Sequence, residues 1–316
     1  MTAVADDVLA ETRAFNAELE RQLAANPATN EMPVEEARRQ RREGGGIFPP
    51  PTFRPERARD VTIEARSGPL RLRVIAPEQA AVGAYLHIHG GGWALSAADF
   101  QDPLLVELAD TTGLCAVSVD YRLAPEHPHP AASDDCEDAA LWLLREGFAE
   151  LGLPELATIG GDSAGGHLSA VTLLRLRDRH GITGAFAAAN LIYGAFDLSM
   201  TPSQRLWGER NLILSTPILH YFGDMFLPGL SDEARRDPDI SPLYAALHDM
   251  PPALFTVGTM DPLLDDSLFM HARWAASGAR AELRTWPEAI HGFNAFPLRV
   301  TAAARAEQYA FLRDAI

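Results

Sequence analysis

Short apolar segments that alternate with helical segments constrain the fold of this chain more than any other feature. The apolar segments lie at 84–88, 114–119, 157–159, 187–192 and 253–257. Most of them are separated by segments with helical periodicity, at 103–111, 131–147, 164–180 and 265–277. Strands that are apolar throughout are typical of parallel sheets that helices cover on both faces. The pattern therefore predicts an α/β fold with a mostly parallel central sheet.

Additional elements are expected at both ends of this series. Residues 61–65 and 70–74 alternate apolar and polar side chains, which indicates half-exposed strands. A last strand is predicted at 281–286 and a last helix at 301–314. We assign 51–197 and 238–316 to one core domain of the α/β type.

Residues 1–50 form a separate segment of helical character. An amphipathic helix is predicted over 4–24, because apolar residues recur there at steps of three or four. Asn30 is the expected cap of a second helix, with Pro33 in its first turn and Gly44 just past its end. Glycines at 44–46 and prolines at 49–51 then interrupt regular structure, and we place a boundary there.

Residues 198–237 interrupt the alternation of strands and helices. They contain several aromatic side chains but no strand pattern, and Thr216 and Pro217 resemble the start of a helix that ends near Leu227. We interpret this segment as an insertion over one edge of the sheet. Together with residues 1–50 it would form a helical cap.

The composition excludes several classes of protein. With 316 residues the chain is long enough for one large core, and its 43 acidic and 27 basic residues give a net charge of −16. This charge disfavours binding to nucleic acid or anionic lipid. We find no signal-peptide pattern and no apolar run of about 18 residues, so we expect a cytoplasmic protein without stable membrane insertion. Cys115 and Cys136 are expected to be reduced thiols.

The most informative motif is Gly161-Asp162-Ser163-Ala164-Gly165. It matches the G-x-S-x-G nucleophile elbow, and it has the required context of a strand before it and a helix after it. Small flanking residues are needed because the serine occupies a strained, crowded turn. On the pentapeptide alone, a glycine-rich turn without chemistry is an equally good interpretation.

A second glycine-rich loop, His89-Gly90-Gly91-Gly92-Trp93, follows the strand predicted at 84–88. Glycines without a Cβ allow backbone N–H groups to approach a ligand, so such a loop can bind an oxyanion. A phosphate-binding loop is the alternative, but the chain has neither a Walker A nor a dinucleotide-binding glycine pattern. His89 is expected to support the loop rather than act as a base.

The two glycine motifs in this order resemble the hormone-sensitive-lipase-like family of α/β-hydrolases, in its bacterial carboxylesterase branch. The resemblance covers most of the chain from about residue 84. Further matching segments are 120–127, 241–243, 261–265 and 291–293. It implies an α/β-hydrolase fold with a helical cap, and it implies that the N–H groups of Gly91, Gly92 and Ala164 form an oxyanion hole. A homodimer is expected by the same analogy.

A serine nucleophile needs a histidine base and an acid that orients it, and in this fold they follow the serine in the order acid, then histidine. His291 has the best setting, because it follows the last predicted strand on a loop. Asp261 follows the strand at 253–257, where α/β sheets place their ligands, and it also lies in a family motif. Asp197 is the rival acid. We therefore predict a Ser163–His291–Asp261 triad.

Other polar residues near these motifs are given structural roles. Asp162 is expected to hold the elbow by hydrogen bonds, and Arg122 and Glu126 to form an ion pair. Asp265 and Asp266 resemble the cap of the following helix. The His127-Pro128-His129-Pro130 run is rejected as a metal site because prolines prevent a helical face and no third ligand is evident.

The predicted reaction is hydrolysis of small esters with short-to-medium acyl groups, through an acyl-enzyme and without a cofactor. Candidates for the walls of an apolar pocket are Trp93, Trp207, Phe222 and Phe293. For each cap aromatic taken singly, packing of the cap against the core is the better interpretation. An amidase, a lactonase or a carbamate hydrolase would use the same site, and a non-catalytic small-molecule binder is the alternative from another class.

Overall fold

The computed structural model describes residues 2–44, 47–48 and 50–316. Its centre is an eight-stranded sheet with the order β1-β2-β4-β3-β5-β6-β7-β8. β1 and β2 join antiparallel at one edge, and the strands from β4 to β8 are parallel. The strands are β1 Ala58–Ala65, β2 Gly68–Ile75, β3 Gly83–Ile88, β4 Leu114–Val119, β5 Ala157–Asp162, β6 Ala189–Ile192, β7 Ala253–Met260 and β8 Ala281–Ile290. The predicted mostly parallel sheet is confirmed.

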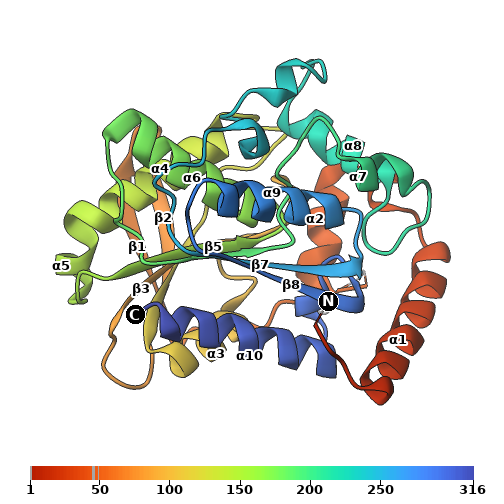
Figure 1. Cartoon of the computed structure of the whole chain (residues 1–316), viewed down its shortest axis with the longest axis horizontal. Helices are drawn as coiled ribbons and strands as arrows, with labels where there is room; N and C mark the ends of the chain where they lie inside the picture. The colour runs from red at the N-terminus through yellow and green to blue at the C-terminus, as the bar shows by residue number, and fades with distance from the viewer. Residues whose placement is uncertain (1, 45–46, 49) are drawn as a thin grey trace.

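Helices cover both faces of this sheet. Figure 1 shows α3 and α10 on one face and α4, α6 and α9 on the other. The helices are α1 Asp6–Ala24, α2 Val34–Glu43, α3 Asp102–Thr112, α4 Ala131–Trp142, α5 Phe148–Leu151, α6 Ala164–His180, α7 Pro202–Leu206, α8 Thr216–Phe226, α9 Leu264–Ala276 and α10 Arg299–Asp314. A π-helical turn, Leu143–Gly147, joins α4 to α5, and short 3-10 turns lie at Thr29–Glu31, Ala234–Arg236, Pro242–Tyr244 and Phe293–Ala295.

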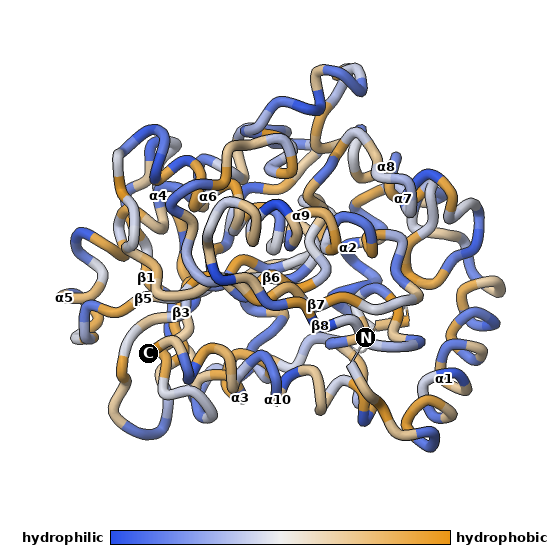
Figure 2. Tube along the Cα trace, viewed as in Figure 1, coloured by the Kyte–Doolittle hydropathy of each residue, from blue (hydrophilic) through white to orange (hydrophobic). Residues whose placement is uncertain are grey.

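The central strands are apolar because both of their faces are covered. Every residue of β3 and β4 is buried, and Figure 2 shows hydrophobic residues concentrated along the strands while the outer helices carry hydrophilic positions. Cys115 and Cys136 are both buried and unpaired. Within the described residues, no helix combines the length and the apolar character needed to cross a bilayer.

The register of the central strands places their carboxyl ends level with one another. Ile88, the last residue of β3, pairs with Val119 at the end of β4 and with Gly161 near the end of β5. Loops that follow these strands therefore leave the sheet at the same edge, where open α/β sheets bind their ligands.

Two predicted boundaries need correction. The last strand extends beyond Trp286 to Ile290, after a bulge in its pairing with β7, and so ends directly before His291. Asn30 does not cap the second helix, because Thr29–Glu31 forms a 3-10 turn, in which Glu31 accepts a hydrogen bond from the Ala28 N–H. α2 runs from Val34 to Glu43, so Pro33 precedes the helix instead of lying in its first turn. Gly44 lies just past its end, as predicted, in a left-handed conformation. Part of the predicted glycine–proline break, residues 45, 46 and 49, lies outside the described residues.

The N-terminal helices occupy different places. α1 packs along the edge strand β8 and against α10, whereas α2 sits beside the loop that follows β3. Arg38 of α2 donates hydrogen bonds to the carbonyls of Ala94 and Ala124. α8 packs against the Thr29–Glu31 turn, and the Tyr221 hydroxyl donates to the Met32 carbonyl at 3.2 Å. α8 therefore contacts the segment that leads into α2.

Candidate active site

Ser163 occupies a strained turn between β5 and α6. Its φ of 56° and ψ of −117° are unusual for a residue with a side chain, and such strain persists only where the surroundings impose it. The Ser163 N–H donates to the Ile192 carbonyl at 2.8 Å. A Cβ on Gly161 or Gly165 would lie 2.0 or 1.8 Å from the Ile88 carbonyl oxygen. Glycines flank the turn because the end of β3 leaves no room for side chains.

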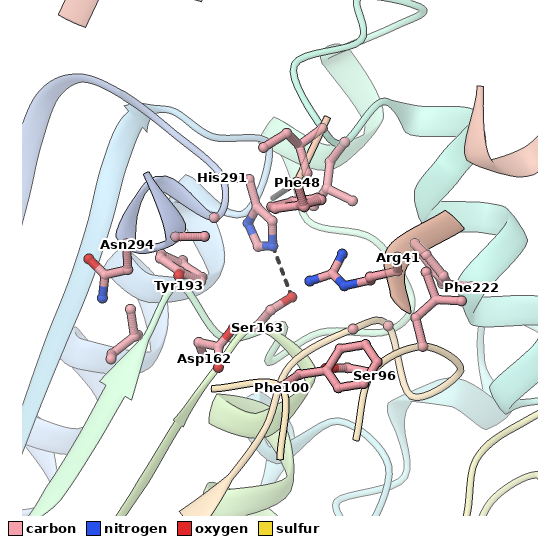
Figure 3. Close-up of a pocket in the computed structure, with 18 of the residues that line it drawn as sticks. Arg41, Phe48, Ser96, Phe100, Asp162, Ser163, Tyr193, Phe222, His291 and Asn294 are labelled. Atoms are coloured by element: carbon pink, nitrogen blue, oxygen red, sulfur yellow. Dashed lines mark hydrogen bonds between the residues drawn. The ribbon is translucent and has the colours of Figure 1, made fainter. Parts of the chain in front are cut away.

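Three side chains that are distant in the sequence form a continuous hydrogen-bonded chain. His291 Nε2 lies 2.9 Å from Ser163 Oγ, the contact dashed in Figure 3, and His291 Nδ1 lies 2.9 Å from Asp261 Oδ2. The second Asp261 oxygen accepts the Leu263 N–H at 2.8 Å. His291 and Asp261 are both buried. With its Nδ1–H donated to the carboxylate, the imidazole presents an unprotonated Nε2 to the serine hydroxyl.

The glycine loop presents free backbone donors beside Ser163. Gly91 and Gly92 have φ values of 119° and 59°, and both line the same cavity as Ser163. No described residue accepts a hydrogen bond from the backbone N–H of Gly91, Gly92 or Ala164. Ala164 follows Ser163 directly and is itself buried. Unsatisfied N–H groups beside a nucleophile are suited to an oxyanion.

The loop is held by its own first residues. His89 donates its Nδ1–H to the Gly90 carbonyl at 2.9 Å and stacks on Tyr121, with ring centroids 4.2 Å apart. As predicted, Asp162 supports the elbow: its Oδ1 accepts the Gly90 N–H at 3.2 Å and the Gln101 amide at 2.9 Å. The glycine loop and the elbow are therefore tied together.

A hydrogen bond joins Trp93, in the glycine loop, to His167 on α6, and it was not predicted from the sequence. Trp93 donates its indole N–H to His167 Nδ1 at 3.0 Å, and His167 Nε2 donates to the Ile240 carbonyl at 2.7 Å. Burial lowers the pKa of His167 to about 4, so its ring is neutral. Trp93 also stacks on Phe226 of α8 at 4.7 Å. No local motif marks these contacts, because they join segments that are far apart in the chain.

A cavity of about 450 Å³ lies in front of Ser163 and His291. Trp93 and Phe222, two of the predicted pocket residues, line it. The other two are not among its described lining residues. Phe293 is fully buried in the core, packed at 5.9 Å against Tyr193, and the Trp207 indole donates instead to the Arg210 carbonyl. Position in the sequence near a motif did not predict which aromatics face the cavity.

Three further residues of the cavity carried no sequence signal. Arg41 and Phe48 enter it from the N-terminal segment, and Tyr193, which follows β6, packs against the His291 ring with centroids 4.8 Å apart. Figure 3 shows all three around the serine and histidine.

Asp197, the rival acid, and Asp266, a predicted helix cap, have other partners. Asp197 accepts hydrogen bonds from Ser199 and from the Tyr244 hydroxyl, at 2.6 and 3.0 Å. Asp266 does not cap its helix. It instead accepts four hydrogen bonds, two on each oxygen, from Phe196 N, Asp197 N, Thr201 Oγ1 and Gln204 Nε2. Asp266 therefore holds the loop after β6.

The predicted Arg122–Glu126 ion pair is wrong. Arg122 pairs with the buried Asp135 at 2.9 Å, and Glu126 pairs with Arg38 at 2.7 Å. Arg38 lowers the pKa of Glu126 to about 2. The described residues contain no group of three His, Cys, Asp or Glu side chains placed to hold a metal ion.

Comparison with known proteins identifies relatives of this chain. A family model for the alpha/beta hydrolase fold matches residues 85–295. The chain is 38% identical over 224 residues to the carboxylesterase NlhH of Mycobacterium tuberculosis, covering 70% of this chain and 69% of that protein. It is 30% identical over 270 residues to an ethyl acetate hydrolase of Pseudomonas putida, covering 83% of each.

Among solved structures, an esterase of Pyrobaculum calidifontis superposes with a TM-score of 0.84 at 30% identity, over 95% of this chain and 97% of the other. The carboxylesterase EstE1 from a metagenomic library gives 0.79 at 31% identity, over 90% and 98%. Fold, motif order and relatives agree, and the chain belongs to the hormone-sensitive-lipase-like group of the α/β-hydrolase family.

Proposed function

We propose that this protein is a carboxylesterase in which Ser163 is the nucleophile, His291 the general base and Asp261 the acid that orients it. The observation that carries the proposal is the chain of 2.9 Å contacts from Asp261 through His291 to Ser163, at the wall of a cavity with free N–H donors. The names of the relatives support ester hydrolysis as the reaction.

In the first half of the reaction, the Ser163 oxygen attacks the ester carbonyl carbon while His291 Nε2 takes the hydroxyl proton. The carbonyl π electrons move onto oxygen, and the N–H groups of Gly91, Gly92 and Ala164 bind the resulting oxyanion. The oxyanion then collapses, the carbon–alkoxide bond breaks, and His291 returns its proton to the departing alcohol. Asp261 stabilises the imidazolium throughout.

In the second half, water replaces the alcohol. His291 takes a proton from the water as its oxygen attacks the acyl-enzyme carbonyl, and the same donors bind the second oxyanion. The bond to Ser163 then breaks and the serine regains its proton from His291. The products are one alcohol and one carboxylic acid, and the enzyme is restored.

The cavity supports small substrates. Its volume of about 450 Å³ lies toward the small end of ligand pockets, which hold about 300–1,000 Å³. We propose that residues 1–50 and 198–237 act together as the cap over the 51–197 and 238–316 core, and that this cap restricts the acyl group to short or medium length. The cytoplasmic location and the homodimer stay predictions.

Covalent labelling tests the proposal directly. A fluorophosphonate should label Ser163 at one group per chain, located by peptide mass spectrometry, and labelling should abolish ester turnover. Labelling elsewhere, or none, would reject the nucleophile and favour a non-catalytic binder. Matched ester, amide, lactone and carbamate substrates then decide between the alternatives: we expect the ester to have the highest kcat/KM.

A further inference from the structure

Arg41 brings a positive charge into the cavity of the proposed active site. It lies in the last turn of α2, and Figure 3 shows its guanidinium pointing into the cavity in the direction of Ser163. Its charge is within electrostatic range of Asp162 and Tyr193, two other lining residues. The side chain thus belongs to the interior of the site.

Arg41 differs from the other arginines of the cavity lining, Arg235 and Arg305, in having no described carboxylate partner. Arg235 pairs with Asp224 at 2.6 Å, and Arg305 pairs with Glu107 at 2.8 Å. The carboxylates of the lining are also engaged, as described above for Asp162 and Asp197. No described carboxylate lies within 4.0 Å of the Arg41 guanidinium. The residues outside the description, 1, 45, 46 and 49, are Met, Gly, Gly and Pro, so none has an acidic side chain.

The surroundings of Arg41 hold the charge in place without neutralising it. Its guanidinium carbon lies 4.1 Å from the centroid of the Phe48 ring, so one face rests on an aromatic surface. Burial lowers the pKa of Arg41, and the residue as a whole is partly buried. An arginine nevertheless stays protonated in proteins, and its planar fork matches a carboxylate in two parallel hydrogen bonds. Asp162 compensates part of this charge from beyond contact distance. A ligand carboxylate would supply the contact partner that a partly buried guanidinium lacks.

We infer that the preferred substrates are esters that carry a free carboxylate, which pairs with Arg41 while the ester group lies at Ser163. This inference rests on the proposed esterase function and adds the class of substrate. The net charge of −16 does not oppose it, because surface charge is screened beyond about 8 Å at physiological salt, whereas a contact pair inside the cavity is not.

The test compares charged and neutral esters of equal length, with the charge on either side of the ester bond. Ethyl hydrogen adipate is compared with ethyl hexanoate, and 4-acetoxybenzoate with 4-acetoxybenzamide, by kcat/KM for the ester bond at pH 7.5. Hydrogen bonds between ions support a preference of about 10- to 100-fold, so we expect the charged ester to be favoured in at least one pair. In that pair Arg41→Gln should lower the charged-to-neutral ratio at least about tenfold, and Arg41→Lys should lower it less.

Arg39→Gln is the matched control. It makes the same charge change on the same helix, but Arg39 is exposed and paired with Glu36 and Glu43, so the ratio should not change. Neutral esters preferred in both pairs, or equal effects of Arg41→Gln on charged and neutral esters, would overturn the inference. The inference would also be overturned if Arg41→Gln changed only the inhibition by the carboxylic acid product and left the charged-to-neutral ratio of kcat/KM unchanged. In each of these cases the neutral esters are still hydrolysed and Ser163 is still labelled, so the proposed function survives. Absence of both would reject the proposed function instead.

Discussion

The core and the segments proposed as its cap, residues 1–50 and 198–237, are built in different ways. In the core, α6 is buried at every position from Ala164 to Arg177, and the turn at Ser163 is enclosed by Ile88, Gly161 and Gly165. In the proposed cap, α2 buries only Val34 and Ala37. One hydrogen bond, from the Tyr221 hydroxyl to the Met32 carbonyl, joins α8 to the segment just before α2.

This difference suggests that the core supports catalysis and that the proposed cap sets the preference among substrates. A strained nucleophile and a three-residue hydrogen-bonded chain need rigid support, because small displacements reduce catalysis steeply. A loosely seated cap can change its side chains without disturbing that support. We therefore expect core substitutions to lower the rate with every ester, and cap substitutions to change the preference among esters.

The largest effect tests the core. Ser163→Ala should lower kcat by about 10⁴-fold or more with every ester, as loss of a triad nucleophile does. Steady-state kinetics with one charged and one neutral ester measures this, and circular dichroism checks the fold. If one ester kept most of its turnover in a clean preparation of Ser163→Ala, the cavity would contain a second catalytic group. The assignment of catalysis to Ser163 would then be wrong.

A matched glycine pair tests the boundary between the two regions. A Cβ on Gly91 would lie 2.3 Å from the Leu95 backbone oxygen, whereas a Cβ on Gly92 would lie 2.5 Å from the Phe222 ring of the cap. Both alanine variants should lower kcat by about 10²-fold, comparable to loss of an oxyanion donor. Adding Phe222→Ala should restore part of the activity of Gly92→Ala and none of that of Gly91→Ala. Equal rescue of both would show that the cap does not contact the loop selectively.

Acid sensitivity should belong to the core. Burial lowers the pKa of His87 and of His167 to about 4, so between pH 6.5 and 4 the unfolded chain takes up protons that the folded protein does not, and stability falls as pH falls. Burial raises the pKa of Asp266 to about 7, so below that pH the folded protein binds this proton more readily than the unfolded chain does, which opposes the loss of stability.

Removing the Asp266 carboxyl should therefore make the free energy of unfolding fall more steeply as the pH is lowered. From pH 7 to pH 5 we expect the free energy of unfolding to fall by about 1–2 kcal/mol in the wild type and by about 3–4 kcal/mol in Asp266→Asn. Urea unfolding at both pH values gives the comparison. A wild-type stability that rises on acidification, or a variant no steeper than wild type, would contradict the pKa directions.

The smallest expected effect concerns the contacts that hold α2 against the core. Arg38 joins α2 to the core through the Ala94 and Ala124 carbonyls and through Glu126. Arg38→Gln should lower the free energy of unfolding by about 1 kcal/mol, because these bonds are partly exposed. It should change kcat/KM by less than about tenfold and unequally among esters of different acyl length. An equal loss of kcat/KM with all esters would show that Arg38 supports catalysis, as core residues do, and does not affect the preference among esters.

Much of the fold could be predicted because its signals are local. The apolar segments indicated the parallel strands, and the helix at 164–180 is confirmed at both ends as α6. The choice of Ser163, Asp261 and His291 followed from their positions after strands, and the structure brings them together. The predictions that failed depended on partners far along the chain: Arg122 pairs with Asp135 rather than Glu126, and Phe293 points into the core rather than the cavity.

The amino-acid sequence by itself determined the order of strands and helices and the strained glycine-flanked turn, because periodicity and backbone sterics act over a few neighbouring residues. Only the tertiary structure decided that α2 places Arg41 in the cavity lining. It also decided that Trp93 donates a hydrogen bond to His167 and that the Phe222 ring packs beside Gly92. These contacts join segments separated by long stretches of chain, and their free energy depends on packing, desolvation and charge pairing that no local pattern encodes.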